Sequence, residues 1–329
     1  TFDRWRADGV LADDPPALYP YRMTATDEDG TVRHTLGVLG ALGIDPAARI
    51  DVLPHEHTTP KAHSDRLSLL RATRANLSAI WGLSLTPGLT ALLDLDRAEA
   101  VDRWDDEDGV THELWRLEDP ATVKAICEAV GATPLVIADG HHRYSTCLIH
   151  ADEPGAPSGA DATMCLVVEL VADQLTVQPI HRLLTGLPAG HDPAAELTAA
   201  FEIGPREPLP DAAVVRRLVQ ERALALIDAE GMRLLRPRTD TGPGVVEPLD
   251  SVRVAAAVNA LPAHELSYQH GVAHAVAAVR SGRADAAILL RPVSVEQIRA
   301  TAQARGLMPP KSTFFYPKPR TGTVFRTLT

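Results

Sequence analysis

The chain has 329 residues, a formal net charge of -11, a hydrophobic content of 45% and only 4% aromatic residues. Its length permits two domains, and its acidic balance argues against a general nucleic-acid-binding protein, which normally carries a basic footprint. No apolar run reaches the length of a membrane span, and no signal-peptide pattern opens the chain. The three cysteines lack the spacing of a metal site or a disulfide framework. We therefore expect a cytoplasmic protein that binds neither nucleic acid nor membrane; the oligomeric state is left open.

The first half of the chain alternates apolar runs with turn signals, which predicts short strands and helices. The predicted elements are, in chain order, strands at 18–23 and 31–42, a helix at 65–80 with Leu67, Leu70 and Leu77 on one side, a hairpin at 104–117 and a helix at 120–130. A buried strand at 135–138 and a helix from Tyr144 to Ala151 follow. This mixture of strands and helices is typical of an α+β protein.

The second half changes composition after Leu187, where Pro, Ala and Arg become frequent up to about residue 248. The predicted elements are a strand at 162–171 paired in a hairpin with 174–179, a helix at 211–224, a mostly helical stretch at 255–282, a strand at 285–290, a helix at 293–304 and an extended tail at 308–318. We expect an α+β fold with a mixed sheet and flanking helices. Residues 1–186 would form the catalytic domain, and residues 187–329 a smaller second domain whose tail returns to the site.

The most informative motif follows the predicted strand at 135–138. It consists of Asp139, Gly140, His141, His142 and Arg143. A strand, a glycine turn and a helix start together present free backbone N–H groups, and the cationic side chains add positive charge at the same point. Gly140 would let the backbone approach a phosphate, and Arg143 would give a forked, charge-assisted contact. The alternative is a turn with His and Arg facing solvent.

A second segment, residues 55–66, is dense in ionisable groups. Glu56 among histidines would serve as a general base, with Lys61 and Arg66 as cations beside it. His55 and His57 would suit zinc, but no third ligand has a diagnostic spacing. The alternative is a solvated loop that leads into a helix.

A third candidate is the tail around Lys311, Ser312 and Thr313, which offers an ammonium and two hydroxyls to an anion. Two prolines before it hold the chain extended. The motif is not a P-loop, because the glycine-rich approach is absent. The spacing alone favours the alternative, an edge strand with exposed polar residues.

These three motifs together resemble a widespread bacterial and archaeal family that carries a domain-of-unknown-function label. The resemblance rests on residues 138–144, on His55, Glu56 and Thr58 with residues 65–66, and on residues 308–318. It runs from about Leu18 to the end of the chain. Relatives usually carry a further N-terminal segment, so we expect part of the first domain to precede Thr1.

The loop at 139–143 also resembles the phosphate loop of the ParB/sulfiredoxin superfamily. Free serine kinases of that superfamily carry Asp-Gly-His-Thr-Arg, which matches here except at His142. Sulfiredoxin has a cysteine where His141 stands, so the resemblance argues against sulfinic acid reduction. ParB proteins have an acidic residue at that point and a separate basic DNA-binding domain that this chain lacks.

The resemblance and the residues together favour a phosphotransferase. It would move a phosphoryl group between a nucleotide, ATP or ADP, and a small hydroxyl compound such as serine, with Mg2+ implied by the nucleotide. Residues 139–143 and 311–313 would hold phosphates, while Glu56, Lys61 and Arg66 would be catalytic. A phosphatase or nucleotide hydrolase, and a nucleotide-binding sensor without turnover, are the alternatives.

Overall fold

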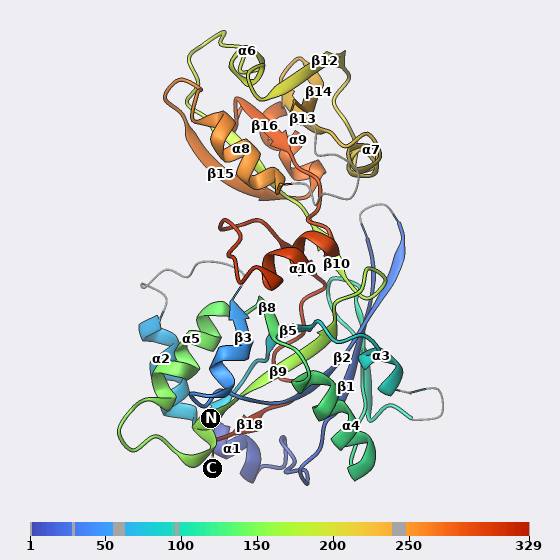
Figure 1. Ribbon diagram of the computed structural model, residues 1–329, viewed down its shortest axis with the longest axis vertical. Coiled ribbons are helices and arrows are strands. Elements are labelled where there is room, and N and C mark those ends of the chain that lie inside the picture. Colours follow the sequence, from blue (N-terminus) through green and yellow to red (C-terminus); the bar gives the residue numbers. More distant parts are fainter. Residues whose placement is uncertain are drawn as a thin grey trace. The chain divides into compact units, whose positions relative to one another are not determined.

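The computed structural model describes residues 2–27, 30–54, 63–93, 95, 99–238 and 248–328. Its contacts group the chain into two compact units (Figure 1). Unit 1 comprises Thr1–Ala25, Val32–Leu175 and Pro317–Thr329, and unit 2 comprises Thr26–Thr31 and Thr176–Tyr316. The division expected from composition at residue 187 stays a prediction. Each unit is described by itself.

Unit 1 is built on an eight-stranded mixed sheet with the order β3-β8-β5-β9-β2-β1-β7-β6. Its strands are β1 (Tyr19–Thr26), β2 (Val32–Gly43), β3 (Val52–Pro54), β5 (Ile80–Ser84), β6 (Asp102–Asp105), β7 (Thr111–Leu114), β8 (Leu135–Asp139) and β9 (Ala162–Glu169). The pairs β3–β8 and β5–β9 are parallel, whereas β8–β5, β9–β2, β1–β7 and β7–β6 are antiparallel. A short antiparallel pair joins β4 (Ala75–Asn76) to β18 (Arg326–Thr327), so the end of the chain returns to this unit.

Helices cover the sheet of unit 1. They are α1 (Phe2–Ala7), α2 (His63–Thr73), α3 (Leu89–Leu92), α4 (Pro120–Gly131) and α5 (His141–Ala151), with 3-10 turns at Ala48–Asp51 and Ser158–Asp161. Helices α2 and α5 lie side by side (Figure 1). Leu70 of α2 and Tyr144 of α5 enter the same buried cluster as Ile137 of β8 and Val167 of β9. The core therefore fixes α5, which follows β8, against the sheet.

Unit 2 is a six-stranded antiparallel sheet with helices on both faces. Its strands, in the order β12-β14-β13-β16-β11-β15, are β12 (Phe201–Glu207), β14 (Gly231–Pro237), β13 (Leu224–Asp228), β16 (Ala286–Leu289), β11 (Ile180–Thr185) and β15 (Glu265–His270). The helices are α6 (Ala194–Leu197), α7 (Val214–Gln220), α8 (Asp250–Val258), α9 (Val272–Arg280) and α10 (Val295–Gln303). Leu224 and Leu226 face one buried cluster, and Ala225 and Ile227 face the other, as the two-residue period of a strand requires.

Several predicted elements are confirmed. The hairpin at 104–117 is the β6–β7 pair, and the helix at 120–130 is α4. Asp119 caps α4 by accepting from the backbone N–H of Thr122 at 2.8 Å, and Pro120 stands where a missing N–H costs nothing. The α+β fold with a mixed sheet, flanking helices and a second sheet domain is likewise confirmed.

The predicted helix at 65–80 is wrong in its second half. Helix α2 ends at Thr73 because Arg74 takes a left-handed backbone conformation, with φ of 48°. Leu77 consequently lies in the connection between β4 and β5 and not on a helix. The leucine spacing alone did not reveal this break.

The predicted hairpin between 162–171 and 174–179 is also wrong. Both edges of β9 are occupied, since β2 and β5 pair with it along its whole length. Residues Thr176–Gln178 instead form β10, which pairs with β17 (Phe314–Tyr316) in unit 2. The strand β10 therefore pairs with β17, more than a hundred residues away in the sequence, and not with the neighbouring strand β9.

Two helix predictions in unit 2 were too long. Helix α7 covers only Val214–Gln220, because Arg222 has a φ of 51° and β13 begins at Leu224. The stretch at 255–282 contains the strand Glu265–His270 between α8 and α9. That strand pairs with β11 across the unit, and such a distant partner is invisible to local periodicity.

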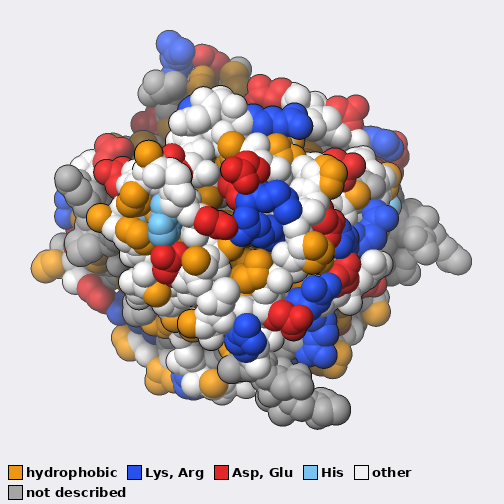
Figure 2. Space-filling view, turned by 90° about the horizontal axis from the view of Figure 1, so that it is seen from above, with side chains coloured by type: hydrophobic (Ala, Val, Ile, Leu, Met, Phe, Trp, Pro, Cys, Tyr) orange, Lys and Arg blue, Asp and Glu red, His pale blue; other side chains and the backbone are white. Residues whose placement is uncertain are grey.

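In the described ranges, no helix is long and apolar enough to cross a membrane. Figure 2 shows one face of the molecule, where Lys and Arg side chains lie among Asp and Glu side chains. Interspersed charges of both signs are the usual pattern of a solvated surface. The expected absence of a nucleic-acid partner stays a prediction.

Candidate functional site

The loop between β8 and α5 has the geometry expected of an anion site. Strand β8 is buried up to Ala138, and Gly140 follows with φ of 90°, in the left-handed region that favours glycine. A Cβ at this position would lie 3.0 Å from Nε and Nη2 of Arg143. Helix α5 begins at His141, three residues earlier than predicted, so its first turn contains both histidines and Arg143. The loop therefore stands at the N-terminus of α5, where the first backbone N–H groups and the positive end of the helix dipole lie.

Two cations share one carboxylate at this loop. Arg143 donates from Nη2 to Oδ2 of Asp139 at 2.7 Å, and from Nη1 to the backbone carbonyl of Ala79. Lys318, on the returning C-terminal segment, donates from Nζ to Oδ1 of Asp139 at 2.6 Å. All three side chains are about one-third exposed, so solvent screening limits each ion pair to about 1 kcal/mol. Asp139 thus brings two cationic side chains to the loop.

Electrostatics keep Asp139 ionised. Partial burial by itself would raise the pKa of its carboxyl, but the nearby Lys318, Arg143 and His141 outweigh that effect. The pKa of Asp139 therefore lies below its ordinary value. The carboxylate holds both cations in position at neutral pH.

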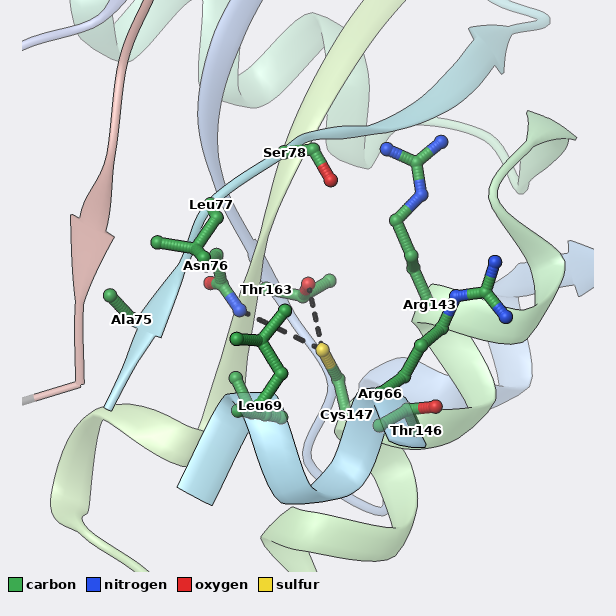
Figure 3. Close-up of a pocket in the computed structure, with 11 residues that line it drawn as sticks. Arg66, Leu69, Ala75, Asn76, Leu77, Ser78, Arg143, Thr146, Cys147 and Thr163 are labelled. Atoms are coloured by element: carbon green, nitrogen blue, oxygen red, sulfur yellow. Dashed lines mark hydrogen bonds between the residues drawn. The ribbon is translucent and has the colours of Figure 1, made fainter. Parts of the chain in front are cut away.

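A cavity of about 140 Å³ opens beside this loop (Figure 3). It is lined by Arg66, Leu69, Leu70, Ala75, Asn76, Leu77, Ser78, Arg143, Thr146, Cys147 and Thr163. In Figure 3 the side chains of Arg66 and Arg143 lie on one side, and those of Ala75 and Leu77 lie on the other. The lining residues include two arginines and, within the described part of the chain, no carboxylate. The cavity is therefore suited to a small anion.

Neutral polar groups form the floor of this cavity. The amide of Asn76 donates to Sγ of Cys147 at 3.7 Å, and Oγ1 of Thr163 lies 3.3 Å from the same sulfur (Figure 3). Oδ1 of Asn76 accepts from the backbone N–H of Met164 at 3.0 Å and from Arg326 at 3.3 Å, which sets the orientation of the amide. Burial raises the pKa of the Cys147 thiol. A neutral thiol is a poor nucleophile, so burial makes this cysteine less reactive.

Arg326 supplies a further positive charge behind Asn76. Besides Asn76, it donates to the backbone carbonyls of Ala162 at 2.9 Å and Gly159 at 2.8 Å. Burial lowers the pKa of its guanidinium, which is nevertheless too basic to lose its proton near neutrality. Its hydrogen-bond partners are neutral carbonyl and amide groups, and the carboxylate of Asp161 is close enough to favour the charged guanidinium.

The structure brings several predicted site residues together. Arg66 on α2 lines the same cavity as Arg143 on α5, although 76 positions separate them in the sequence. The residues of the loop at 139–143 are adjacent to it. Glu56 and Lys61 lie outside the described residues. The predicted site residues did not include Lys318, Asn76 or Thr163. For Lys318, the two flanking prolines were a sequence signal that could have pointed to it.

The predicted Lys311, Ser312 and Thr313 belong to unit 2. Ser312 is buried, and its Oγ lies 2.8 Å from Oγ of Ser251 and donates to the carbonyl of Pro309 at 2.7 Å. Lys311 has φ of 61°, and its carbonyl accepts from the buried Arg182. The hydroxyl of Ser312 is thus engaged within unit 2, and a role of this motif in phosphate binding stays a prediction.

The described residues do not build a site for Mg2+ by themselves. No group of three or more His, Cys, Asp or Glu side chains in the described ranges could hold a metal ion. Both oxygens of Asp139 already accept from Lys318 and Arg143. Mg2+ commonly binds through one or two carboxylates plus substrate phosphates, and the expected Mg2+ stays a prediction.

Comparisons place this architecture among known proteins. A family model described as "Protein of unknown function (DUF1015)" matches residues 1–279. Among curated proteins, no match is found.

Solved structures similar to this one include a conserved hypothetical protein from Pyrococcus furiosus, at 14% identity and a TM-score of 0.43, covering 89% of this chain and 95% of that chain. A free serine kinase in complex with AMP matches at 13% identity and a TM-score of 0.43, covering 85% of this chain and 86% of that one. SbnI from Staphylococcus aureus, truncated at its C-terminus, matches at 12% identity and a TM-score of 0.46, covering 86% of this chain and 84% of that one. Likeness at this level assigns no activity to the chain.

The ionised state of Asp139 has a measurable consequence. Its pKa is lower in the folded protein than in the unfolded chain, where it is about 3.9. The stabilisation it gives is therefore fully present above about pH 4 and is lost as the pH falls through the folded-state pKa. Asp139→Asn should lower the free energy of unfolding by about 1 kcal/mol at pH 7. That difference should shrink towards zero as the pH falls through the folded-state pKa, as followed by urea unfolding at each pH. A difference that stays constant over this range would contradict the assignment.

Proposed function

We propose that this chain, which belongs to the DUF1015 family of proteins of unknown function, is a phosphotransferase. It moves a phosphoryl group between a nucleotide, ATP or ADP, and a small hydroxyl compound, specifically a serine-like amino acid. The observation that carries the proposal is the loop at 139–143. Its left-handed glycine, its helix start and its two cations lie beside a cavity lined by a second arginine.

The loop holds the phosphates of the nucleotide in this proposal. Phosphoryl transfer depends on positioning and charge neutralisation more than on covalent chemistry by the protein. The backbone N–H groups at the start of α5 bind phosphate oxygens, and the absence of a side chain at Gly140 permits close approach. Arg143 and Lys318, already held by Asp139, neutralise the charge without having to be reorganised when the nucleotide binds.

The adjacent cavity holds the acceptor. Ligand pockets for drug-sized molecules are about 300 Å³ or larger, and an apolar cavity of about 150 Å³ takes a molecule the size of benzene. At about 140 Å³ the cavity suits a small amino acid but not a nucleotide. The guanidinium groups of Arg66 and Arg143 offer forked contacts to a carboxylate. The hydroxyls of Ser78 and Thr163 and the amide of Asn76 offer neutral partners to the rest of the acceptor.

Glu56 is assigned as the general base that takes the proton of the acceptor hydroxyl. A carboxylate is the usual base in such reactions, and it must lie within hydrogen-bond reach of the hydroxyl. Lys61 is assigned to the neutralisation of charge on the transferred group, together with Arg66. Mg2+, where the nucleotide carries it, would supply neutralisation of phosphate charge. The roles of Lys311, Ser312 and Thr313 at the phosphates are part of the same proposal.

A direct assay tests the activity. Purified protein with Mg2+, ATP or ADP and a panel of hydroxyl amino acids should give a phosphorylated amino acid, detected by mass. Release of free phosphate with water alone would indicate a hydrolase instead. Tight nucleotide binding without turnover across the panel would indicate a sensor.

The cationic loop can be tested by a matched pair of arginine variants. Arg143→Ala should weaken nucleotide binding by about 2 kcal/mol, because it removes a charge-assisted contact. Arg71→Ala removes an arginine of α2 that pairs with Glu153 on the surface, outside the cavity, and should leave the affinity unchanged. Isothermal titration measures both, and thermal unfolding shows whether Arg143→Ala remains folded. Equal affinities of the two variants would remove Arg143 from the binding site.

The proposed base predicts a separation between binding and turnover. Glu56→Gln keeps the size and polarity of the side chain but removes the basic carboxylate. It should lower kcat by roughly 100-fold and leave nucleotide affinity nearly intact. If kcat changes less than about threefold, Glu56 is a surface residue paired with a neighbouring cation, where its loss matters little.

A further inference from the structure

A buried polar chain lies in unit 1 outside the candidate site. Tyr21 of β1 and His112 of β7 are fully buried, and Oη of Tyr21 lies 2.7 Å from Nδ1 of His112. Nε2 of the same imidazole lies 2.9 Å from Oδ2 of Asp106, in the turn between β6 and β7. The ring of Trp104 stacks on His112 at 5.1 Å between centroids, with 16° between the planes. A tyrosine, a histidine and an aspartate thus form one connected chain in the core.

Arg320 contacts both ends of this series of hydrogen-bonded side chains, Asp106 at one end and Tyr21 at the other. The guanidinium donates from Nε to Oδ2 of Asp106 at 2.6 Å and from Nη2 to Asp108 at 2.8 Å. The backbone N–H of Arg320 donates to Oη of Tyr21 at 3.3 Å. Both the main chain and the side chain of Arg320 are therefore held by the β6–β7 hairpin and the strand beside it.

The direction of these hydrogen bonds follows from the chemistry of the groups. An ionised carboxylate only accepts, so Nε2 of His112 carries the proton and Nδ1 accepts from the hydroxyl of Tyr21. Burial would raise the pKa of Asp106, but hydrogen bonds from His112, Val110 and Arg320 hold it well below its ordinary value. Burial raises the pKa of Tyr21 to about 12, so its hydroxyl keeps its proton. Each donor in this series of side chains, from Tyr21 to Asp106, therefore has an acceptor.

Arg320 is joined to the candidate site by a short and stiff connection. Lys318 stands two residues earlier and donates to Asp139, and prolines occupy positions 317 and 319. A proline fixes its own φ and restricts the residue before it to an extended conformation. Two residues span at most about 7 Å, so fixing Arg320 confines the backbone of Lys318.

We propose that Tyr21, His112, Asp106 and Arg320 form a clamp that positions Lys318 on Asp139. None of the four lines the cavity, so they are positioning residues that act through Lys318. The clamp rests on the proposed function for its effect on phosphate binding. Its effect on the contact between Lys318 and Asp139 is independent of any activity.

The test measures that contact with and without the clamp. The coupling between Lys318 and Asp139 is obtained from the unfolding free energies of Lys318→Met, Asp139→Asn and the double variant. The same cycle is then repeated in the Arg320→Met background. We expect the coupling to be lost there. It should persist in the Arg103→Met background, a control on the same hairpin whose exposed side chain lies 3.6 Å from Glu113. An unchanged coupling in the Arg320→Met background overturns the clamp.

Nucleotide affinity gives a second and separate measurement. Arg320→Met and Lys318→Met should each weaken ATP binding by about 10-fold, or about 1.4 kcal/mol. The double variant should show no further loss, whereas independent structural damage would add. If the wild-type protein binds no ATP but the coupling depends on Arg320, the proposed function fails and the clamp stands. If Arg320→Met does not fold, Tyr21→Phe removes the hydroxyl that accepts from Arg320 while keeping the buried ring, and the same outcomes decide.

Discussion

The candidate site depends on the carboxylate of Asp139. It stands at the end of a buried strand, accepts from Arg143 on one oxygen and from Lys318 on the other, and so joins two segments that are far apart in the sequence. Without it, two cations would face each other at the same loop and repel. With it, both side chains are oriented before any ligand arrives. The carboxylate of Asp139 therefore fixes the positions of the two cationic groups.

The cavity beside the loop extends the same electrostatic pattern. Arg66 and Arg143 line it, and Arg326 lies behind its polar floor with neutral acceptors only. Arg326 also ties the end of the chain to Asn76 and to the carbonyls of Gly159 and Ala162. The overall charge of -11 gave no sign of these arginines, because a total charge does not report how the charges are distributed.

Local sequence signals predicted what depends on neighbouring residues. The turn at Asp139 and Gly140, the helix at 120–130 and the β6–β7 hairpin were predicted because each is determined within about ten residues. The pairing of β10 with β17 and the strand at Glu265–His270 were missed because their partners are distant in the chain. Lys318 was missed for the same reason, since its partner is 179 positions away. The motif at 139–143 was recognisable from its own residues. Its cationic neighbours Lys318 and Arg66 are brought to it only by the fold.

The cavity floor bears on which chemistry the site can support. Cys147 lies beside Arg143, where an ionised thiol would be a strong nucleophile. Burial acts against ionisation more strongly than the nearby guanidinium groups favour it, and the pKa of the thiol is raised. Its sulfur is moreover held between Asn76 and Thr163, which suits a recognition surface and not an attacking group. The raised pKa keeps this thiol protonated and so makes it a weaker nucleophile. Transfer to an acceptor hydroxyl requires charge, shape and orientation from the protein more than a nucleophile of its own, and the described lining of the cavity offers these.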